Sequence, residues 1–203
     1  MSPSDLGLVQ AVRKRVFEAS ALFGIALLVI SGPFWSHPVH RLVEAGGLLL
    51  ITLCIVGRTL CSIYISGHKS NVIIDSGPYS VCRNPLYVFS LLGAIGVGAL
   101  SGSIVVSITF GAITWIVQRV VISKEEAFLL GKHGSIYRAY LQKVPRFWPN
   151  FSLWHSGETI VVRPRGVLRT FADASLFLLA IPIVEIIEHL KEVGWMPVLL
   201  QLP

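Results

Sequence analysis

Long apolar runs, separated by short polar segments, constrain the fold of this chain most strongly. The chain has 203 residues, of which 53% are hydrophobic and 14% are charged, whereas soluble globular domains carry about a quarter charged residues. The runs at 16–35, 42–65 and 104–122 could each cross a hydrocarbon core of about 30 Å as helices that rise about 1.5 Å per residue. Composition and runs together predict an all-α integral membrane protein.

The order of the runs predicts a polytopic helical bundle with about five membrane helices. Residues 86–100 form a short third span whose glycines suit close helix packing, and a tight turn joins it to the run at 104–122 as a helical hairpin. Residues 171–190 contain a proline and end in charged residues, which predicts either a fifth span or an interfacial helix; we favour the span. We expect a single membrane domain over 1–203, with a two-span scaffold at 1–66, a region of polar motifs at 67–149, and a connector with the last helix at 150–203.

Basic residues predict which ends of these helices face the cytoplasm. The formal net charge is +6, and the positive residues cluster before the first run, between the second and third runs, and after the fourth. An even number of spans separates these clusters, so all three lie on one side, which the positive-inside rule assigns to the cytoplasm. Anionic lipid is therefore the expected partner of the positive charge, and the chain shows no nucleic-acid-binding motif.

Cysteine and histidine spacing gives no sign of a metal site. Cys54, Cys61 and Cys82 lack C-x-x-C spacing, so we interpret them as small buried side chains. His37 and His40 stand three residues apart, but the intervening proline predicts a turn there. We therefore expect no bound metal.

Two charged residues interrupt the second apolar run. Glu44 lies near one end of the run and fits the membrane interface. Arg58 lies about two turns from the other end, where it could either extend its head to the interface or face a polar cavity. Both interpretations of Arg58 stay open at the level of sequence.

The polar stretch DSGPYSVCRNPLY, at residues 75–87, separates the second and third apolar runs. Its Ser-Gly-Pro segment is rich in turn formers, since proline presets φ and glycine allows positive φ. Pro85 suits the first turn of the helix that follows. The stretch is either an ordinary interhelical loop or a functional loop at the mouth of a membrane helix.

A second polar and aromatic region follows the fourth run, at residues 123–149. Its first residues suggest that the fourth helix continues past the membrane surface until Gly131 and Gly134 interrupt it. Tyr137 and Tyr140 then have the spacing of a short amphipathic helix. The hairpin of the third and fourth spans brings this region to the same face of the membrane as residues 75–87.

The chemistry of the two regions suits a zwitterionic ligand with a flat heterocycle. Arg83 could hold a ligand carboxylate, Glu125 or Glu126 an ammonium, and the tyrosines a ring or a sulfonium. S-adenosylmethionine has these parts. The plain alternatives are that the acids form a solvated helix end and that the tyrosines anchor the interface.

These segments resemble the isoprenylcysteine carboxyl methyltransferase family, whose wider relatives are the phospholipid N-methyltransferases. The resemblance covers about residues 71–149, through GPYSVCRNPLY, a short hairpin and EEAFLLGKHGSIYRAYLQKVPRFWP. It implies a helical membrane enzyme with S-adenosylmethionine on the cytosolic side and an acceptor that enters from the lipid. With Arg83, the implied cofactor contacts are Asn71, Val72, Ile73, Ile74, Tyr79, Asn84, Pro85, Leu86, Tyr87 and Glu125.

The chain departs from this family at two positions. Asn84 stands where the family has histidine, and an amide can donate and accept hydrogen bonds but cannot shuttle a proton. Val121 stands where the isoprenylcysteine enzymes have an arginine implicated in holding the acceptor. Arg119 lies seven residues before Glu126, about two turns, so it could serve the acceptor or pair with Glu126.

The expected function is methyl transfer from S-adenosylmethionine to a lipophilic acceptor, with Arg119 and Glu126 as catalytic residues. A prenyl-cysteine-like carboxylate needs no base, whereas a lipid amine must lose a proton to a group such as Glu126. The alternatives are an NADPH-dependent enzyme that resembles the sterol reductases and a non-catalytic membrane protein that keeps the scaffold.

Overall fold

The computed structural model describes residues 24–66, 72–157 and 159–203, and the chain divides into two compact units. The first unit comprises Met1–Leu50, Ala94–Val121 and Leu179–Pro203. The second unit comprises Ile51–Gly93 and Ile122–Leu178. Each unit is described by its own contacts below.

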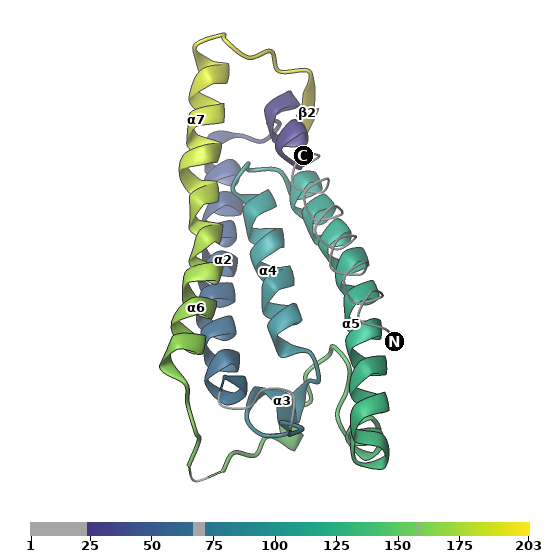
Figure 1. Cartoon of the computed structure of the whole chain (residues 1–203). Helices are drawn as coiled ribbons and strands as arrows, with labels where there is room; N and C mark the ends of the chain where they lie inside the picture. The colour runs from purple at the N-terminus through teal and green to yellow at the C-terminus, as the bar shows by residue number, and fades with distance from the viewer. Residues whose placement is uncertain (1–23, 67–71, 158) are drawn as a thin grey trace, which may run out of the picture. The chain divides into compact units, whose positions relative to one another are not determined.

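The described chain is almost entirely helical, as Figure 1 shows. Residues 24–30 are helical and precede the short strand β1. In chain order the elements are β1 (Ser31–Pro33), α2 (His37–Ile65), α3 (Pro78–Val81), α4 (Pro85–Ala99), α5 (Ile104–Lys143), a 3-10 turn (Phe151–Leu153), α6 (Pro164–Ser175), a 3-10 turn (Leu176–Leu179), α7 (Ala180–Glu192) and β2 (Leu200–Leu202).

Three helical segments of the described chain are long and apolar enough to cross a membrane. They are His37–Ile65, Ile104–Lys143 and Pro164–Glu192. The helix α4 is apolar but has only 15 residues. The predicted all-α membrane class is therefore confirmed, and the segment at 171–190 lies within a helix of sufficient length for a span.

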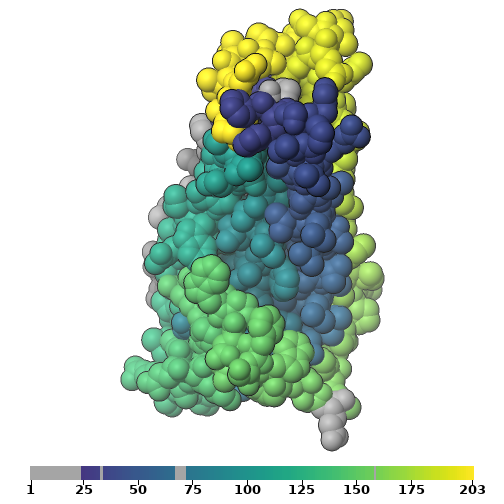
Figure 2. Space-filling view, turned by 180° about the vertical axis from the view of Figure 1, so that it is seen from behind, coloured from purple at the N-terminus to yellow at the C-terminus, as the bar shows by residue number. Residues whose placement is uncertain are grey.

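The first predicted run, at 16–35, differs from the structure where it is described. Residues 16–23 lie outside the described residues, and the helix that follows ends at residue 30. A strand replaces its last residues because β1 pairs in parallel with β2, in a register that places Ser31 opposite Leu200. The space-filling view shows the yellow C-terminal residues against the purple residues near 31 (Figure 2). No local pattern in the sequence predicted this pairing.

Helix boundaries also shift at α2 and α5. α2 begins at His37 rather than at residue 42, since Ser36 O accepts hydrogen bonds from the N–H groups of Val39 and His40. The predicted break at Gly134 is confirmed, because its φ of 56° and ψ of −124° are not helical. The predicted break at Gly131 is wrong: this residue stays helical, and an isolated glycine only weakens a helix.

Close packing at glycines organises each unit. In the first unit, a Cβ on Gly98 would lie 2.6 Å from the Cα of Ser107, so α4 and α5 approach closely there. In the second unit, a Cβ on Gly57 would lie 2.2 Å from the Phe89 ring, so α2 and α4 pack with no room for a side chain. The small-residue face that the sequence suggested for α4 therefore serves helix packing.

Candidate functional site

The polar stretch 75–87 is held by backbone hydrogen bonds to the segment 145–155. The N–H of Gly77 donates to His155 O at 2.7 Å, and the N–H of Arg83 donates to Pro145 O at 2.9 Å. Between them, the N–H of Asn150 donates to Val81 O at 2.9 Å. These bonds fix the loop and the helix α3 within the second unit.

Gly77 is needed at the start of α3 for two reasons. Its φ of 57° lies in the left-handed region, which is unfavourable for residues other than glycine. A Cβ at this position would also lie 2.2 Å from the ring of Tyr64, near the end of α2. The turn that the sequence predicted at Ser-Gly-Pro is therefore required by conformation and by packing.

Glu126 forms the centre of a polar cluster in the second unit. Its Oε1 accepts a hydrogen bond from Nδ2 of Asn84 at 3.1 Å and lies 3.6 Å from Nη1 of Arg83. Its Oε2 lies 3.0 Å from Nη2 of Arg146. The side chains of Arg83 and Glu126 are each only 15% exposed, so these contacts are well shielded from water. One carboxylate thus joins two cations and an amide.

Arg146 completes this cluster, although the sequence did not mark it as a site residue. Its carbonyl accepts a second hydrogen bond from Nδ2 of Asn84 at 3.2 Å, and its Nη2 donates to Oγ of Ser123 at 2.9 Å. Arg146 lies between Pro145 and Phe147, in the VPRFWP part of the motif that carried the family resemblance. That position was the available signal.

Three tyrosines lie beside the cluster. The hydroxyl of Tyr140 donates to the carbonyl of Tyr79 at 2.8 Å, and the rings of Tyr137 and Tyr140 lie 5.8 Å apart. Tyr79 is only 6% exposed, and burial, with smaller contributions from neighbours that include Glu125, raises its pKa well above the ordinary value. A hydrogen bond and a ring contact thus join the three tyrosines.

Three buried polar atoms of this part of the second unit have no hydrogen-bond partner within the described protein. They are Nε of Arg83 and Nε of Arg146, whose guanidinium groups contact Glu126, and the hydroxyl of Tyr79. Buried polar groups are normally paired, so unpaired donors at one place indicate a missing partner. The cluster therefore offers hydrogen-bond donors to a polar ligand.

Cys82 connects the loop to the same later segment. Its Sγ donates to the carbonyl of Phe147 at 3.3 Å and is 3.6 Å from the carbonyl of Arg146. Burial raises the pKa of this thiol. We interpret Cys82 as a packing residue, as the sequence predicted.

The remaining predicted contacts that the structure describes lie in the same loop, at the start of α4 and, for Glu125, on α5. Asn84 O accepts from the N–H of Tyr87 in the first turn of α4, which begins at Pro85 and continues through Leu86. Asn71 lies outside the described residues. Val72, Ile73 and Ile74 are described without regular secondary structure, and Glu125 lies exposed beside Glu126.

Arg119, the other predicted catalytic residue, belongs to the first unit. Its guanidinium carbon lies 5.9 Å from the centre of the Trp115 ring, within the range of a cation–π contact. The described ion pairs of Glu126 are with Arg83 and Arg146. A joint role for Arg119 and Glu126 stays a prediction.

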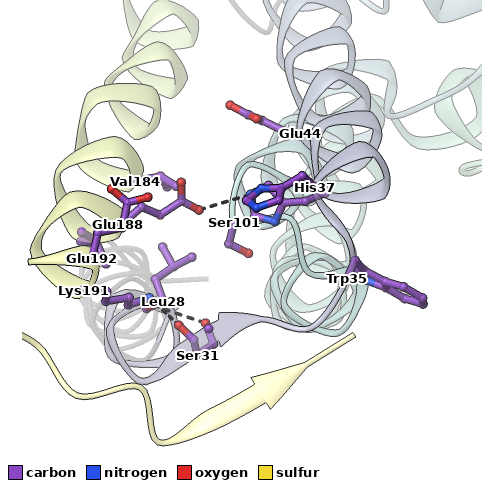
Figure 3. Close-up of a pocket in the computed structure, with 13 residues that line it drawn as sticks. Leu28, Ser31, Trp35, His37, Glu44, Ser101, Val184, Glu188, Lys191 and Glu192 are labelled. Atoms are coloured by element: carbon purple, nitrogen blue, oxygen red, sulfur yellow. Dashed lines mark hydrogen bonds and ion pairs between the residues drawn. The ribbon is translucent and has the colours of Figure 1, made fainter. Parts of the chain in front are cut away.

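A separate cavity of about 350 Å³ lies within the first unit (Figure 3). The ion pair of His40 Nε2 with Glu188 Oε1, at 3.5 Å, links α2 to α7 across it. Lys191 Nζ donates to Leu28 O at 2.6 Å and to Ser31 O. None of the predicted site residues lines this cavity. Trp35 Nε1 and His40 Nδ1, from two residues that line it, have no hydrogen-bond partner in the described chain. The described residues contain no group of three His, Cys, Asp or Glu arranged to hold a metal ion.

Comparisons with known proteins agree with the sequence motifs. The family model described as phospholipid methyltransferase matches residues 47–135, which include the polar loop, the hairpin and Glu126. The protein-S-isoprenylcysteine O-methyltransferase of Schizosaccharomyces pombe is 32% identical over 78 residues, which cover 38% of this chain and 33% of the relative. No solved structure matches the chain.

Two bacterial relatives match over much more of their length. The nickel-cobalt-cadmium resistance protein of Alcaligenes xylosoxydans xylosoxydans is 34% identical over 157 residues, or 77% of this chain and 73% of the relative. The cobalt-zinc-cadmium resistance protein of Cupriavidus metallidurans is 33% identical over 180 residues, or 88% of this chain and 83% of the relative. With the family match and the isoprenylcysteine relative, these similarities show that the chain belongs to the phospholipid methyltransferase family of membrane proteins.

Proposed function

We propose that this protein transfers a methyl group from S-adenosylmethionine to a lipophilic acceptor at the cytoplasmic side of a membrane. The carrying observation is the meeting of Arg83, Asn84 and Arg146 at Glu126. These residues belong to the two segments whose motifs resemble membrane methyltransferases. The cytoplasmic orientation rests on the positive-inside rule.

The chemistry of the cluster fits this cofactor. A methionine carboxylate accepts several N–H or O–H hydrogen bonds, and Arg83, Arg146 and Tyr79 each have a buried donor without a partner among the described residues. The rings of Tyr137 and Tyr140 offer apolar surface for a heterocycle or a sulfonium. The further contacts that we propose are Asn71, Val72, Ile73, Ile74, Asn84, Pro85, Leu86, Tyr87 and Glu125.

The protein's main contribution would be alignment and exclusion of water. When bound, S-adenosylmethionine would supply a methyl group attached to a positively charged sulfur. The sulfur compound would be the leaving group, as a neutral thioether. Glu126 holds Arg83, Arg146 and Asn84 in one arrangement, so the loop that carries the cofactor contacts is fixed before the acceptor arrives. Tyr79, Tyr137 and Tyr140 would keep water from the reacting atoms.

The state of Glu126 favours an acceptor that needs no base. Both of its oxygens are already engaged, Oε1 by Asn84 and Arg83 and Oε2 by Arg146. A carboxylate acceptor forms its new C–O bond as the C–S bond breaks, the electron pair stays on sulfur, and no proton has to leave. We therefore propose a carboxylate in preference to an amine as the methyl acceptor.

The names of two relatives support a second candidate function, a part in resistance to nickel, cobalt, zinc or cadmium. The similarity extends over most of both relatives. Growth of a metal-sensitive host that expresses this protein, on a series of metal concentrations, tests this function. If resistance depends on methyl transfer, the Asn84→Asp variant abolishes it.

Calorimetric binding of S-adenosylhomocysteine to the purified full-length protein tests the methyltransferase proposal. We expect the wild type to bind, and the Glu125→Ala and Tyr87→Ala variants to bind at least about tenfold more weakly. Glu185→Ala, on the exposed side of α7, is the matched control and retains binding. Absence of binding by the wild type contradicts the proposal, and binding of NADPH instead supports the reductase alternative. Unchanged binding in both site variants contradicts the assigned site.

A further inference from the structure

Arg58 lies on the packed face of α2, within the second unit. Its neighbours on that face are Cys54, Gly57 and Cys61, all of them buried. Gly57 packs against Phe89, and Cys54 packs against Gly93, so this face of α2 meets α4. The opposite face carries residues such as Val56, which is 61% exposed and suits contact with lipid. Arg58 therefore lies toward the interface of α2 with α4.

The positive charge of Arg58 has no acidic partner among the residues that the structure describes. Its Nη1 donates to Oγ of Ser90 on α4 at 2.8 Å, and that hydroxyl donates in turn to the carbonyl of Leu86 at 2.7 Å. Its Nε is shielded from solvent and has no hydrogen-bond partner in the described chain. Arg83 and Arg146, by contrast, share the carboxylate of Glu126. An arginine within an apolar helix normally pairs with a polar or anionic group, and the Nε of Arg58 is a donor available for one.

The depth of Arg58 suits the head group of an amphiphile. It lies seven residues before Ile65, the end of α2, which is about 10 Å along the helix axis. Ser90 lies five residues after Pro85, the start of α4, or about 7.5 Å along that axis. The pair is therefore one to two turns from the helix ends that adjoin the loop with Arg83 and Asn84. A molecule with its head at this depth has its chain among the apolar side chains and lipid.

We propose that Arg58 and Ser90 bind the anionic head group of an amphiphile that enters from the lipid, and that this amphiphile is the methyl acceptor. A guanidinium can bind a carboxylate or a phosphate through two parallel N–H donors. The identity of the amphiphile as the acceptor rests on the proposed function. The anion site itself rests on the charge of Arg58 and on its buried Nε, which have no acidic partner and no hydrogen-bond acceptor, respectively, among the described residues.

The test uses three probes with the same oleoyl chain and different head groups. Oleate carries a carboxylate, oleamide is its neutral counterpart, and oleoyl lysophosphatidate carries a phosphate. Binding of each is measured by calorimetry to the purified full-length protein in a neutral maltoside detergent. We expect the wild type to prefer oleate to oleamide by about tenfold or more.

Variants of Arg58 show whether this preference comes from the proposed site. In Arg58→Gln the preference falls to less than about twofold, whereas Arg58→Lys, which keeps the charge, retains part of it. Arg41→Gln, at an exposed position of the same helix, retains all of it. Circular dichroism checks that each variant is folded. The comparison of oleate with oleamide on the wild type tests the anion site even if a variant does not fold.

The outcomes separate this inference from the proposed function. Equal binding of oleate and oleamide by the wild type, or an undiminished preference in folded Arg58→Gln, overturns the anion site. Tighter, Arg58-dependent binding of the phosphate probe assigns the site to a bilayer phospholipid and overturns its role for the acceptor. Binding of S-adenosylhomocysteine is measured on the same samples: its absence beside an intact oleate preference contradicts the proposed function and leaves the anion site standing.

Discussion

The amide nitrogen Nδ2 of Asn84 lies 3.1 Å from Oε1 of Glu126, across 42 residues of sequence. This hydrogen bond joins the polar loop before α4 to the helix α5. It also occurs at the position where the chain departs from the isoprenylcysteine family, which has histidine in place of Asn84. The departure therefore lies at the centre of the cluster.

Replacing Asn84 by aspartate keeps the shape of the side chain but reverses this interaction. The new carboxylate would face Glu126 without a donor between them, and Arg146 O would lose its hydrogen bond from Nδ2. We expect Asn84→Asp to lower the free energy of unfolding by about 1–3 kcal/mol, measured by thermal unfolding in detergent. Asn150→Asp is the matched control, because Oδ1 of the exposed Asn150 only accepts a bond from Ser152 N. Equal effects of the two substitutions would contradict the importance of the Asn84–Glu126 contact.

Glycine substitutions separate backbone strain from steric clash. Gly77 and Gly134 have nearly the same φ, 57° and 56°, but a Cβ meets the Tyr64 ring only at Gly77. Gly134→Ala should lower the free energy of unfolding by about 1–2 kcal/mol. Gly77→Ala should lower it by about 1–3 kcal/mol more than Gly134→Ala does. Gly131→Ala, in a helical and open position, should raise it by about 0.5–1 kcal/mol. The order of unfolding temperatures checks this prediction, and a Gly77→Ala protein as stable as Gly134→Ala would refute it.

The Tyr79 hydroxyl provides a prediction in which stability and binding change in opposite directions. Tyr79→Phe removes a buried hydroxyl that has no partner in the described protein, so it should raise the free energy of unfolding by about 1 kcal/mol. If this hydroxyl contacts the cofactor, S-adenosylhomocysteine should bind about tenfold more weakly. Tyr140→Phe is the matched comparison, because it breaks the bond to Tyr79 O and should destabilise the protein by about 1 kcal/mol. Destabilisation by Tyr79→Phe would show that the hydroxyl has a structural role instead.

Alkaline pH should destabilise the protein partly through Cys82. Burial raises the pKa of this thiol above the ordinary value of 9.0, so the unfolded chain releases the proton first as the pH rises. The corresponding stability is fully present below pH 9 and is lost as the pH rises through the pKa of the folded protein. Between these two pKa values the wild type should lose up to about 1.4 kcal/mol per pH unit more than Cys82→Ser, which does not titrate. Unfolding free energies measured at several pH values above 9 check the slopes, and parallel slopes would rule out this contribution.

Local sequence pattern determined the class of the fold and much of its layout. Apolar runs predict membrane helices because burial in hydrocarbon requires about 20 apolar residues with internal backbone hydrogen bonds. The turn at Gly77, the start of a helix at Pro85 and the break at Gly134 follow from the backbone preferences of glycine and proline. The order of the motifs also predicted that the loop at 75–87 and Glu126 belong to one site.

Tertiary structure alone decided which groups pair at that site and which do not. Arg146 reaches Glu126 and Asn84 only because backbone bonds hold the segment after α5 against α3, and the packing of Gly57 against Phe89 brings Arg58 of α2 to Ser90 of α4. The parallel pairing of β1 with β2 likewise joins segments about 170 residues apart. Such contacts depend on how distant helices pack, whereas periodicity and turn preference describe only neighbours along the chain. Arg83, Asn84 and Glu126 could therefore be named from the sequence, but Arg146 and the contacts among these four residues could not.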